Sequence, residues 1–357
     1  MKILHISYSY DFTDGGITTV VKQIIKEQKK ANLSVEWLAS NYHIHKLGKK
    51  NFLKKIHQIN PSIIHLHGLW RLHTRVTKNF VKMGIPYVIT PHGMLDDWAL
   101  KQSIIKKIIS WKFWEKYAFD NCSFVQALSL SEFETIRKIN STWKIHVITN
   151  GVSLPNKQNF SLKDSPKCWR DKIPTNAKVL LFIGRFHKKK GIKELIKAWE
   201  IVIKNKSSED WWLCFVGAGE LKILNKRELN NNHKRIIVSK PEFGIEKEKV
   251  FKNASAFILP SFSEGLPMAP LEAMSYGIPC LISKHCNLPG AIKIGAAIET
   301  NPKVKNLVES LEILFKMDIK NRNKMIDLAY KYISDKHSWK KLTSEIKYLY
   351  SSICEDI

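Results

Sequence analysis

The residues with the clearest chemical potential lie between positions 256 and 283, in AFILPSFSEGLPMAPLEAMSYGIPCLIS. A strand ending at Pro260 is followed by a loop that carries Glu264 and by a helix that contains Glu272. In a parallel sheet, ligands bind where strands end, and the free N–H groups of a helix start favour an anion. The loop GLPMA therefore suits a phosphate group.

The two glutamates of this segment need a different ligand, because a carboxylate beside a phosphate is repelled. We expect Glu264 and Glu272 to bind sugar hydroxyls, one on a nucleotide ribose and the other on a hexose. The alternative interpretation leaves Glu272 as a first-turn residue that the helix dipole favours.

A pair of cations follows the strand at the start of the segment LFIGRFHKKKGIKELIKAW, residues 181–199. Arg185 comes directly after Gly184, and Lys190 follows five residues later, before a glycine and a helix. Arginine offers a planar fork of donors and lysine a mobile point charge, and together they can neutralise a leaving diphosphate without a metal ion. Lys188 and Lys189 are interpreted as part of a solvated basic loop.

Two glycines and a histidine follow strands in the N-terminal half. Gly15 and Gly16 lie between the first apolar run and a helical pattern, so that backbone N–H groups can approach a phosphate or an acceptor. In TPHGM, His92 follows another strand, where it can donate to a phosphate or polarise a sugar hydroxyl. A structural hydrogen bond within the loop is the alternative role.

The histidines of IIHLHG, His65 and His67, occupy alternate positions and so share one face of a strand. Zinc needs further ligands at recognisable spacing, and the sequence offers none, so we expect no metal site.

The elements that position these residues alternate between short apolar runs and amphipathic stretches, the pattern of parallel sheets covered on both faces. The predicted strands are 2–7, 34–39, 62–66, 86–90, 123–127 and 144–149, then 178–183, 211–216, 235–239, 256–260 and 279–283. The polar stretch 155–177, with its prolines, is predicted to be the linker between the two sets. The fold class is therefore α/β, in two halves.

Charge and composition restrict the partners. The 357 residues carry 58 Lys+Arg against 32 Asp+Glu, a net charge of +26, which attracts polyanions. Only eight of the cations are arginine, whereas nucleic-acid readers rely on arginine for bidentate contacts. A lysine-rich coding preference is the alternative explanation of the charge, and we expect no nucleic-acid partner.

The cysteines and the apolar runs bear on the compartment. None of the six cysteines forms a CxxC pair, so we expect reduced core thiols. The N-terminal apolar stretch is too short and too polar for a signal peptide, and no run approaches the roughly 18 apolar residues of a membrane span. We expect a cytoplasmic protein, with peripheral contact to the inner face of the plasma membrane left open.

Taken together, these segments resemble the retaining glycosyltransferases of family four, the "glycosyl transferases group 1" type with the GT-B fold. The resemblance runs from Gly15-Gly16 through IIHLHG, TPHGML, the NGV at 150–152, IGRFHKKKG and VGAGE, and ends with the E-x7-E signature, Glu264 to Glu272. It covers essentially the whole chain. The phrase TPHGMLDDWAL looks most like bacterial enzymes that build lipopolysaccharide, capsule or exopolysaccharide.

The resemblance implies two facing Rossmann-like domains with a cleft between them. The N-terminal acceptor-binding domain is predicted over residues 1–160 together with a C-terminal helix, 338–357, that crosses back to it. The donor-binding domain is predicted over residues 161–337.

The resemblance also implies roles for the residues. Arg185 and Lys190 would bind the donor diphosphate, Glu272 the ribose, and Glu264 the donor sugar, with His92 near the anomeric centre and Gly16 near the diphosphate and acceptor. The donor sugar would also contact backbone groups of Gly265, Leu266, Pro267 and Met268. Acceptor-side candidates are Gly15, Asp96, Asp97 and Trp98.

The expected reaction moves a hexose from a nucleotide-diphosphate sugar to a growing, lipid-linked surface glycan. Retention would follow from same-face attack, with a departing phosphate oxygen taking the acceptor proton. Because no DxD motif occurs, we expect activity without a metal or any other cofactor. The alternatives are a nucleotide-sugar 2-epimerase of the same fold and, more distantly, a polyanion-binding protein or a Rossmann oxidoreductase. The segment VGAGE disfavours the oxidoreductase, because it lacks the third glycine of the dinucleotide fingerprint.

A membrane surface is the last partner that the sequence suggests. Residues 101–117, KQSIIKKIISWKFWEKY, combine five lysines with isoleucines and aromatic residues. A basic amphipathic helix with tryptophan is attracted to anionic lipid. The alternative is an ordinary helix packed on the N-terminal domain.

Overall fold

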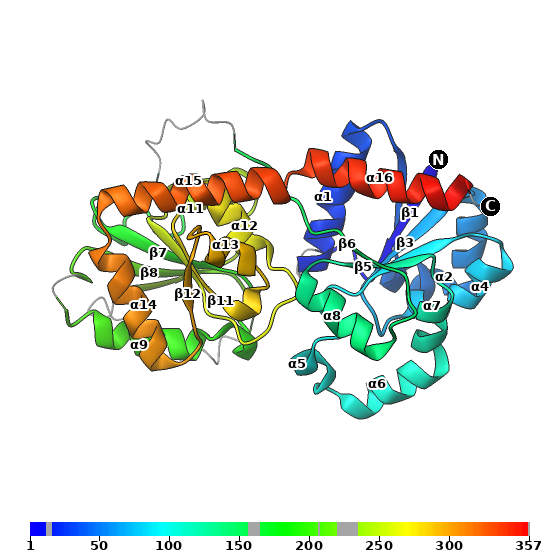
Figure 1. The fold of residues 1–357 in the computed structure, drawn as a ribbon, viewed down its shortest axis with the longest axis horizontal. Helices are drawn as coiled ribbons and strands as arrows, with labels where there is room; N and C mark the ends of the chain where they lie inside the picture. The colour runs from blue at the N-terminus through cyan, green and yellow to red at the C-terminus, as the bar shows by residue number, and fades with distance from the viewer. Residues whose placement is uncertain (12–15, 156–164, 206–207, 220–234, 356–357) are drawn as a thin grey trace. The chain divides into compact units, whose positions relative to one another are not determined.

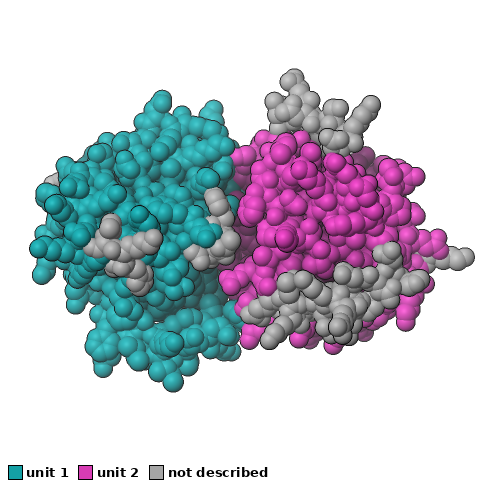
Figure 2. Space-filling model, turned by 180° about the vertical axis from the view of Figure 1, so that it is seen from behind, with its two compact units in different colours: residues 1–151, 337–357 teal, residues 152–336 magenta. Residues whose placement is uncertain are grey.

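The computed structural model describes residues 1–11, 16–155, 165–205, 208–219 and 235–355, with the backbone alone at 44–47. The chain divides into two compact units, shown in teal and magenta in Figure 2. Unit 1 comprises Met1–Gly151 and His337–Ile357, and unit 2 comprises Val152–Lys336. Residues 156–164 of the predicted linker lie outside the described residues. The cleft between the domains stays a prediction.

Unit 1 is built on a six-stranded parallel sheet with the order β2-β1-β3-β4-β5-β6. Its strands are β1 Lys2–Ser7, β2 Ser34–Ala39, β3 Ile63–His67, β4 Tyr87–Thr90, β5 Phe124–Ala127 and β6 Ile145–Val147. The inner strands β3, β4 and β5 are buried along their whole length, as parallel strands covered on both faces are. The strand order reverses between β1 and β3, and such a reversal is where parallel α/β sheets bind ligands.

Helices cover both faces of this sheet (Figure 1). They are α1 Gly16–Lys30, α2 Ser40–Ile59, α3 Leu72–Arg75, α4 Thr77–Lys82, α7 Lys116–Asp120, α8 Leu130–Ile139 and α16 Trp339–Glu355. One core cluster lies between the sheet and α2, α4, α7 and α8, and contains Phe52, Phe80 and Phe119. The other lies under α1 and α16 and contains Val21, Ile346 and Tyr350.

The C-terminal helix α16 is part of unit 1 and lies beside α1 (Figure 1). Its first residue, Trp339, packs so closely on Gly151 that a Cβ at this glycine would lie 2.4 Å from the indole ring. His337, just before the helix, is hydrogen-bonded through Nδ1 to the Asn150 carbonyl at 3.1 Å. The NGV segment therefore serves as the seat of α16 as well as following β6.

Unit 2 repeats the architecture with the strand order β12-β11-β10-β7-β8-β9. Its strands are β7 Lys178–Ile183, β8 Trp211–Val216, β9 Ile236–Ser239, β10 Ala256–Leu259, β11 Cys280–Ser283 and β12 Ile298–Thr300. The described helices are α9 Ile192–Val202, α11 Gly244–Lys252, α12 Met268–Ser275, α13 Pro289–Lys293, α14 Val304–Lys316 and α15 Ile319–Lys336. Two parallel α/β units confirm the expected fold class, and the sequence missed only β12 among these strands.

The basic helix predicted over 101–117 is present from Ile104 onward and differs from the prediction in its start and in a wider turn along its length. After the short helix α5, Asp97–Leu100, Ser103 takes a left-handed conformation at φ 53°, and α6 spans Ile104–Ser110. A π-helical turn, η2 Trp111–Glu115, then leads into α7. The wider turn accompanies a buried contact, since the Glu115 carboxylate accepts hydrogen bonds from the Trp70 N–H at 2.6 Å and from the Thr74 hydroxyl at 2.7 Å.

All six cysteines are free, and four of them are buried. Burial raises the pKa of Cys168 and Cys286 to about 12, which keeps these thiols protonated and unreactive.

Candidate functional site

The loops that follow β7 and β10 in unit 2 lie together because the two strands are neighbours in the sheet. Gly191, at φ +69°, lies so close to the second loop that a Cβ there would lie 2.1 Å from the Pro260 carbonyl oxygen. The Phe262 N–H donates to the Lys189 carbonyl at 2.7 Å. The two segments with predicted chemistry, IGRFHKKKG and SEGLPMA, therefore form one site at the carboxyl ends of the strands.

Glu264 is the centre of this site and is buried. Its Oε1 lies 2.5 Å from Lys190 Nζ and accepts from the Ser261 hydroxyl at 2.6 Å, while its Oε2 lies 3.8 Å from Lys189 Nζ. Burial alone would raise the pKa of Glu264, but the lysine cations hold that pKa below its ordinary value. The carboxylate is therefore ionised at neutral pH.

Two features of this cluster go beyond the sequence analysis. Lys189 contacts the carboxylate, so the prediction that it belongs to a solvated loop was wrong; neighbouring Lys188 is exposed. Asn287, at φ 58°, donates its side-chain amide to the carbonyls of Glu264 and Gly265, both at 2.6 Å. This asparagine fixes the loop from a third strand end, after β11, and no sequence motif pointed to it.

Glu272 lies on α12, one helix turn beyond its first residue, Met268, and the loop residues Gly265, Leu266 and Pro267 lead into this helix. Leu266 is buried, and the N-cap residue of α12 is Pro267, whose side chain makes no capping hydrogen bond. Lys247 on α11 lies 2.6 Å from Glu272 Oε1, a partner that the sequence analysis missed because α11 carries no recognisable signal. This ion pair fixes the carboxylate against a neighbouring helix.

Arg185 contrasts with Lys190. Its guanidinium is exposed and pairs with no other side chain in the described part of the chain. Besides the two lysines that pair with Glu264, the site therefore contains Arg185 as a cation without a side-chain partner among the described residues. An anion entering here would meet Arg185 first and would compete with Glu264 for Lys190.

In unit 1, His92 lies just beyond the carboxyl end of β4, half-buried and in a left-handed conformation at φ 56°. The next residue, Gly93, donates its N–H to Glu132 Oε1 at 2.6 Å. The second oxygen of Glu132 accepts from the Leu128 N–H at 2.7 Å, and Ser129 Oγ accepts from the Glu132 N–H. Glu132 therefore ties the TPHG loop to α8.

Glu132 was not predicted as a site residue, although its S-x-x-E spacing from Ser129 is the signature of a capping box. The remaining candidates of unit 1 lie in exposed or half-buried positions. Gly16 is the exposed first residue of α1, while Asp96, Asp97 and Trp98 lie at the start of α5, with Asp96 at its N-cap. Gly15 lies outside the described residues.

A histidine cluster stands behind His92. His5 on β1 is paired in register with His65 on β3, and the ligand atoms of His5, His65 and His67 all lie within 4.8 Å of one another. The sequence did not reveal His5 as a third member, because strand pairing is not readable from it. Each ring nitrogen of the three has a hydrogen-bond partner: Gln28, Tyr350, Thr90, His92 or another histidine of the cluster. That arrangement favours a hydrogen-bonded network over a metal centre.

Comparison with known proteins places this architecture. The family model "Glycosyl transferases group 1" matches residues 167–332, and the model "Glycosyltransferase Family 4" matches residues 46–155. The chain is 29% identical over 237 residues, 62% of its length, to an Escherichia coli enzyme named UDP-Gal:alpha-D-GlcNAc-diphosphoundecaprenol alpha-1,3-galactosyltransferase. It is 28% identical over 228 residues, 58% of its length, to a lipopolysaccharide 1,6-galactosyltransferase of Salmonella typhimurium.

These alignments span 57% and 60% of the two relatives, so they cover little more than half of each relative. Among solved structures, the chain is similar to Anabaena HepE in complex with UDP and glucose, with a TM-score of 0.74, 16% identity and coverage of 99% and 100% of the two chains. At this identity the likeness concerns the fold, which is the two-domain arrangement called GT-B.

Proposed function

The chain belongs to the group 1, family 4 glycosyltransferases, and from this premise we propose that it transfers a hexose from a nucleotide-diphosphate sugar to a growing surface glycan. The observation that carries the proposal is the Lys190–Glu264 pair at the adjoining ends of β7 and β10, with Arg185 exposed beside it. A diphosphate needs cations and a sugar needs an ionised acceptor of hydroxyl groups, and both are present in one place.

The leaving diphosphate is the group on which the mechanism depends. As the bond between the anomeric carbon and the β-phosphate breaks, negative charge grows on the phosphate oxygens. Arg185 and Lys190 supply fixed positive charge there, together with backbone N–H groups at the start of α12. When Lys190 turns to the phosphate, Glu264 is released to accept hydrogen bonds from the hexose hydroxyls.

The remaining donor contacts follow from the same arrangement. Glu272, already oriented by Lys247, would accept hydrogen bonds from the ribose hydroxyls. Unit 1 would supply His92 and the acceptor-side residues Gly16, Asp96, Asp97 and Trp98. Retention would proceed by same-face attack, in which a departing phosphate oxygen takes the proton of the acceptor hydroxyl. No metal enters this scheme, since the two cations perform its role.

The names of the relatives bear on the substrates. The E. coli relative is named for UDP-galactose and a diphosphoundecaprenol-linked acceptor, and the Salmonella relative for lipopolysaccharide. Both support a lipid-linked or lipopolysaccharide acceptor for this chain. The 2-epimerase and polyanion-binding alternatives draw no support from these relatives.

The proposal is tested by transfer assays with UDP-, GDP- and ADP-sugars on lipid-linked glycan acceptors. We expect Arg185→Ala and Lys190→Ala each to lower kcat by about 10²-fold or more, the cost typical of removing one donor that stabilises developing charge. Lys188→Ala is the matched control, because Lys188 lies in the same loop but is exposed. Wild-type kcat in the Arg185→Ala/Lys190→Ala double variant would refute the assigned chemistry.

We further propose that unit 1 contacts an anionic membrane through α6 and η2. Five large apolar side chains there are exposed by 48–71%, namely Ile104, Ile105, Ile108, Ile109 and Phe113. An ordinary packed helix would bury them. Lysines surround them, and no acidic residue occurs between positions 98 and 114, so the charge complements anionic headgroups. Among the described residues, no helix has the length and apolarity needed to cross a bilayer.

Vesicle sedimentation tests this contact. We expect binding to phosphatidylglycerol vesicles that weakens with salt, and Ile105→Ser/Ile108→Ser to weaken it about tenfold or more, since each isoleucine loses apolar burial. Ile313→Ser, at a comparably exposed isoleucine of α14, is the control. Absence of binding at low salt would contradict the proposal. With such a contact the protein would work at the inner face of the plasma membrane.

A further inference from the structure

A continuous row of polar side chains crosses the interior of unit 1 and ends at His92. Gln28 Oε1 lies 2.8 Å from His5 Nε2, His5 Nδ1 lies 2.8 Å from His67 Nε2, and His67 Nδ1 lies 3.1 Å from His92 Nε2. Gln28, His5 and His67 are all buried. The mechanism proposed above gives these three residues no role.

None of these imidazoles carries a charge at neutral pH. Burial lowers the pKa of His5 to about 4 and that of His92 to about 3, and burial also holds the pKa of His67 well below its ordinary value. A neutral imidazole has one N–H and one bare nitrogen, so each ring in the row donates at one end and accepts at the other. All N–H groups along the row therefore donate in the same direction, and Gln28, at the start of the row, decides which direction that is.

This direction of donation is set by a second row of hydrogen bonds, which begins at a backbone carbonyl. Gln126 Nε2 donates to the Ile148 carbonyl at 2.8 Å, so Gln126 Oε1 is left to accept from the Thr90 hydroxyl at 3.3 Å. The Thr90 oxygen then accepts from His65 Nε2 at 2.6 Å. His65 Nδ1 is consequently bare and accepts from the Tyr350 hydroxyl at 2.5 Å.

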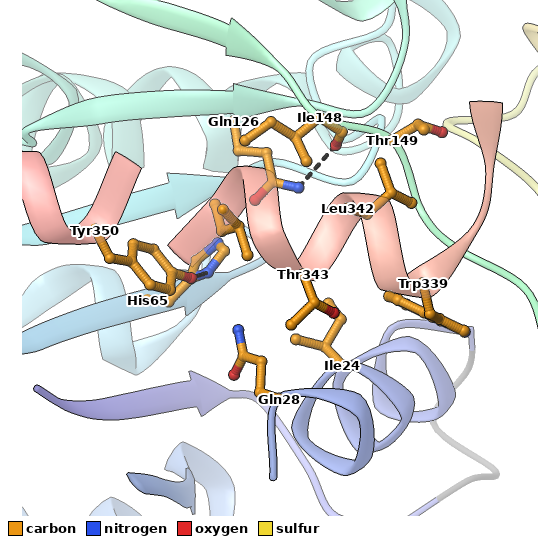
Figure 3. Close-up of a pocket in the computed structure, with 11 residues that line it drawn as sticks. Ile24, Gln28, His65, Gln126, Ile148, Thr149, Trp339, Leu342, Thr343 and Tyr350 are labelled. Carbon is orange, nitrogen blue, oxygen red and sulfur yellow. Dashed lines mark hydrogen bonds between the residues drawn. The ribbon is translucent and has the colours of Figure 1, made fainter. Parts of the chain in front are cut away.

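The amide nitrogen of Gln28 lies on the Tyr350 side in Figure 3, although among the described residues it has no partner within hydrogen-bond distance. The hydroxyl proton of Tyr350 is donated to His65, so the Tyr350 oxygen presents only lone pairs toward Gln28, and these disfavour the reversed amide. Burial raises the pKa of Tyr350, and the Gln28 amide offsets part of that rise, as a donor aimed at the oxygen does. With its nitrogen toward Tyr350, Gln28 presents the carbonyl oxygen to His5, and a carbonyl oxygen can only accept.

We propose that Gln28, His5 and His67 are positioning residues that hold His92 as the tautomer protonated on Nε2, with a bare Nδ1 facing the substrate. The steps follow one another: His5 donates Nε2–H to Gln28, His67 donates Nε2–H to His5, and His92 donates Nε2–H to His67. Within the described part of the chain His92 Nδ1 has no partner. It can accept a hydrogen bond from a sugar hydroxyl, and it cannot donate one to a phosphate.

This inference rests on the proposed function, because it assigns His92 the recognition of a hydroxyl group. It also explains why two histidines in IIHLHG and one in KILHIS share one face of the sheet. The network of His5, His65 and His67 transmits an orientation set at Ile148 and α16 to the end of β4. Gln28 lies on α1 and contacts no substrate in this scheme, so its substitution tests the relay without removing a ligand.

The test uses the full chain with 15N-labelled histidine, and long-range proton–nitrogen spectra that report which ring nitrogen is protonated. Loss of one signal set in His92→Gln assigns His92. We expect wild-type His92 to be protonated on Nε2, and Gln28→Leu to introduce the Nδ1-protonated form. Gln23→Leu is the matched control, since it makes the same change on the same helix outside the row.

Kinetics supply the second measurement. Gln28→Leu is expected to lower kcat about tenfold, the cost of one hydrogen bond, with little change in the donor KM. An Nδ1-protonated His92 in the wild type would overturn the proposal, as would a Gln28→Leu variant with the wild-type tautomer and kcat. The expected tautomer together with no transfer from any nucleotide-sugar would leave the relay standing and refute the proposed function instead.

Discussion

The buried ion pair between Lys190 and Glu264 provides a quantitative test of the donor site. Lys190→Met removes the charge and leaves an unbranched side chain one atom shorter, so that Lys189, 3.8 Å away, is the one cation among the described residues that still pairs with the buried Glu264 carboxylate. Breaking a buried pair from one side costs about 3–5 kcal/mol, and the remaining lysine places the expectation near the lower end, at about 3 kcal/mol. For a cooperative unit of this size, that loss lowers Tm by about 6–12 °C.

The stabilisation that the Lys190–Glu264 pair contributes changes with pH in a definite direction. The cations hold the pKa of Glu264 below its ordinary value, so the pair stabilises the wild type above the unfolded pKa, about 4.3, and that stabilisation is lost as pH falls through the folded pKa. Without Lys190, burial dominates and the carboxyl group resists ionisation. The destabilisation of Lys190→Met should therefore be largest near pH 8 and should shrink toward pH 4.5.

The assay is thermal unfolding of the full chain in a double-mutant cycle with Glu264→Gln. We expect Lys190→Met/Glu264→Gln to be more stable than the sum of the single losses predicts, by about 2 kcal/mol, because no unpaired buried charge remains. Lys188→Met is the control for removal of one exposed charge. Strictly additive losses, or a Lys190→Met effect that does not vary with pH, would refute the argument.

Three further expectations concern metal, pH and backbone. Transfer should proceed at its full rate in excess EDTA, and loss of turnover that manganese restores would contradict the metal-free scheme. Burial raises the pKa of Glu115 to about 7, so between the unfolded and folded pKa values the folded state binds a proton that the unfolded state releases. The free energy of unfolding should therefore fall by up to about 3 kcal/mol as pH rises from 4.5 to 8. Urea unfolding measures this profile, and Glu115→Gln should flatten it. Gly191→Ala should lower stability by about 2 kcal/mol or more, because the new Cβ would meet the Pro260 carbonyl at a φ of +69°. Gly16→Ala should not, since a Cβ there meets no atom of the described residues within 4 Å.

Much of the fold was readable from local pattern. Buried parallel strands need apolar runs, and loops need glycine, proline and polar residues, so the strands predicted over 2–7, 178–183 and 256–260 lie within one residue of the observed bounds. The E-x7-E spacing likewise located Glu264 before a helix and Glu272 within it, because a loop and the helix after it are contiguous in sequence.

Local sequence thus carries the order of the elements and the chemical types of the residues at the strand ends. Which of these side chains meet depends on how the strands are arranged in the folded units. That β10 lies beside β7 brings Glu264 to Lys190, and that β1 lies beside β3 brings His5 to His67. Strand order and register arise from packing of whole faces, whereas periodicity records only whether each residue is buried. The partners of ionised and titrating groups, and hence their protonation states, were therefore set by contacts between residues far apart in the chain.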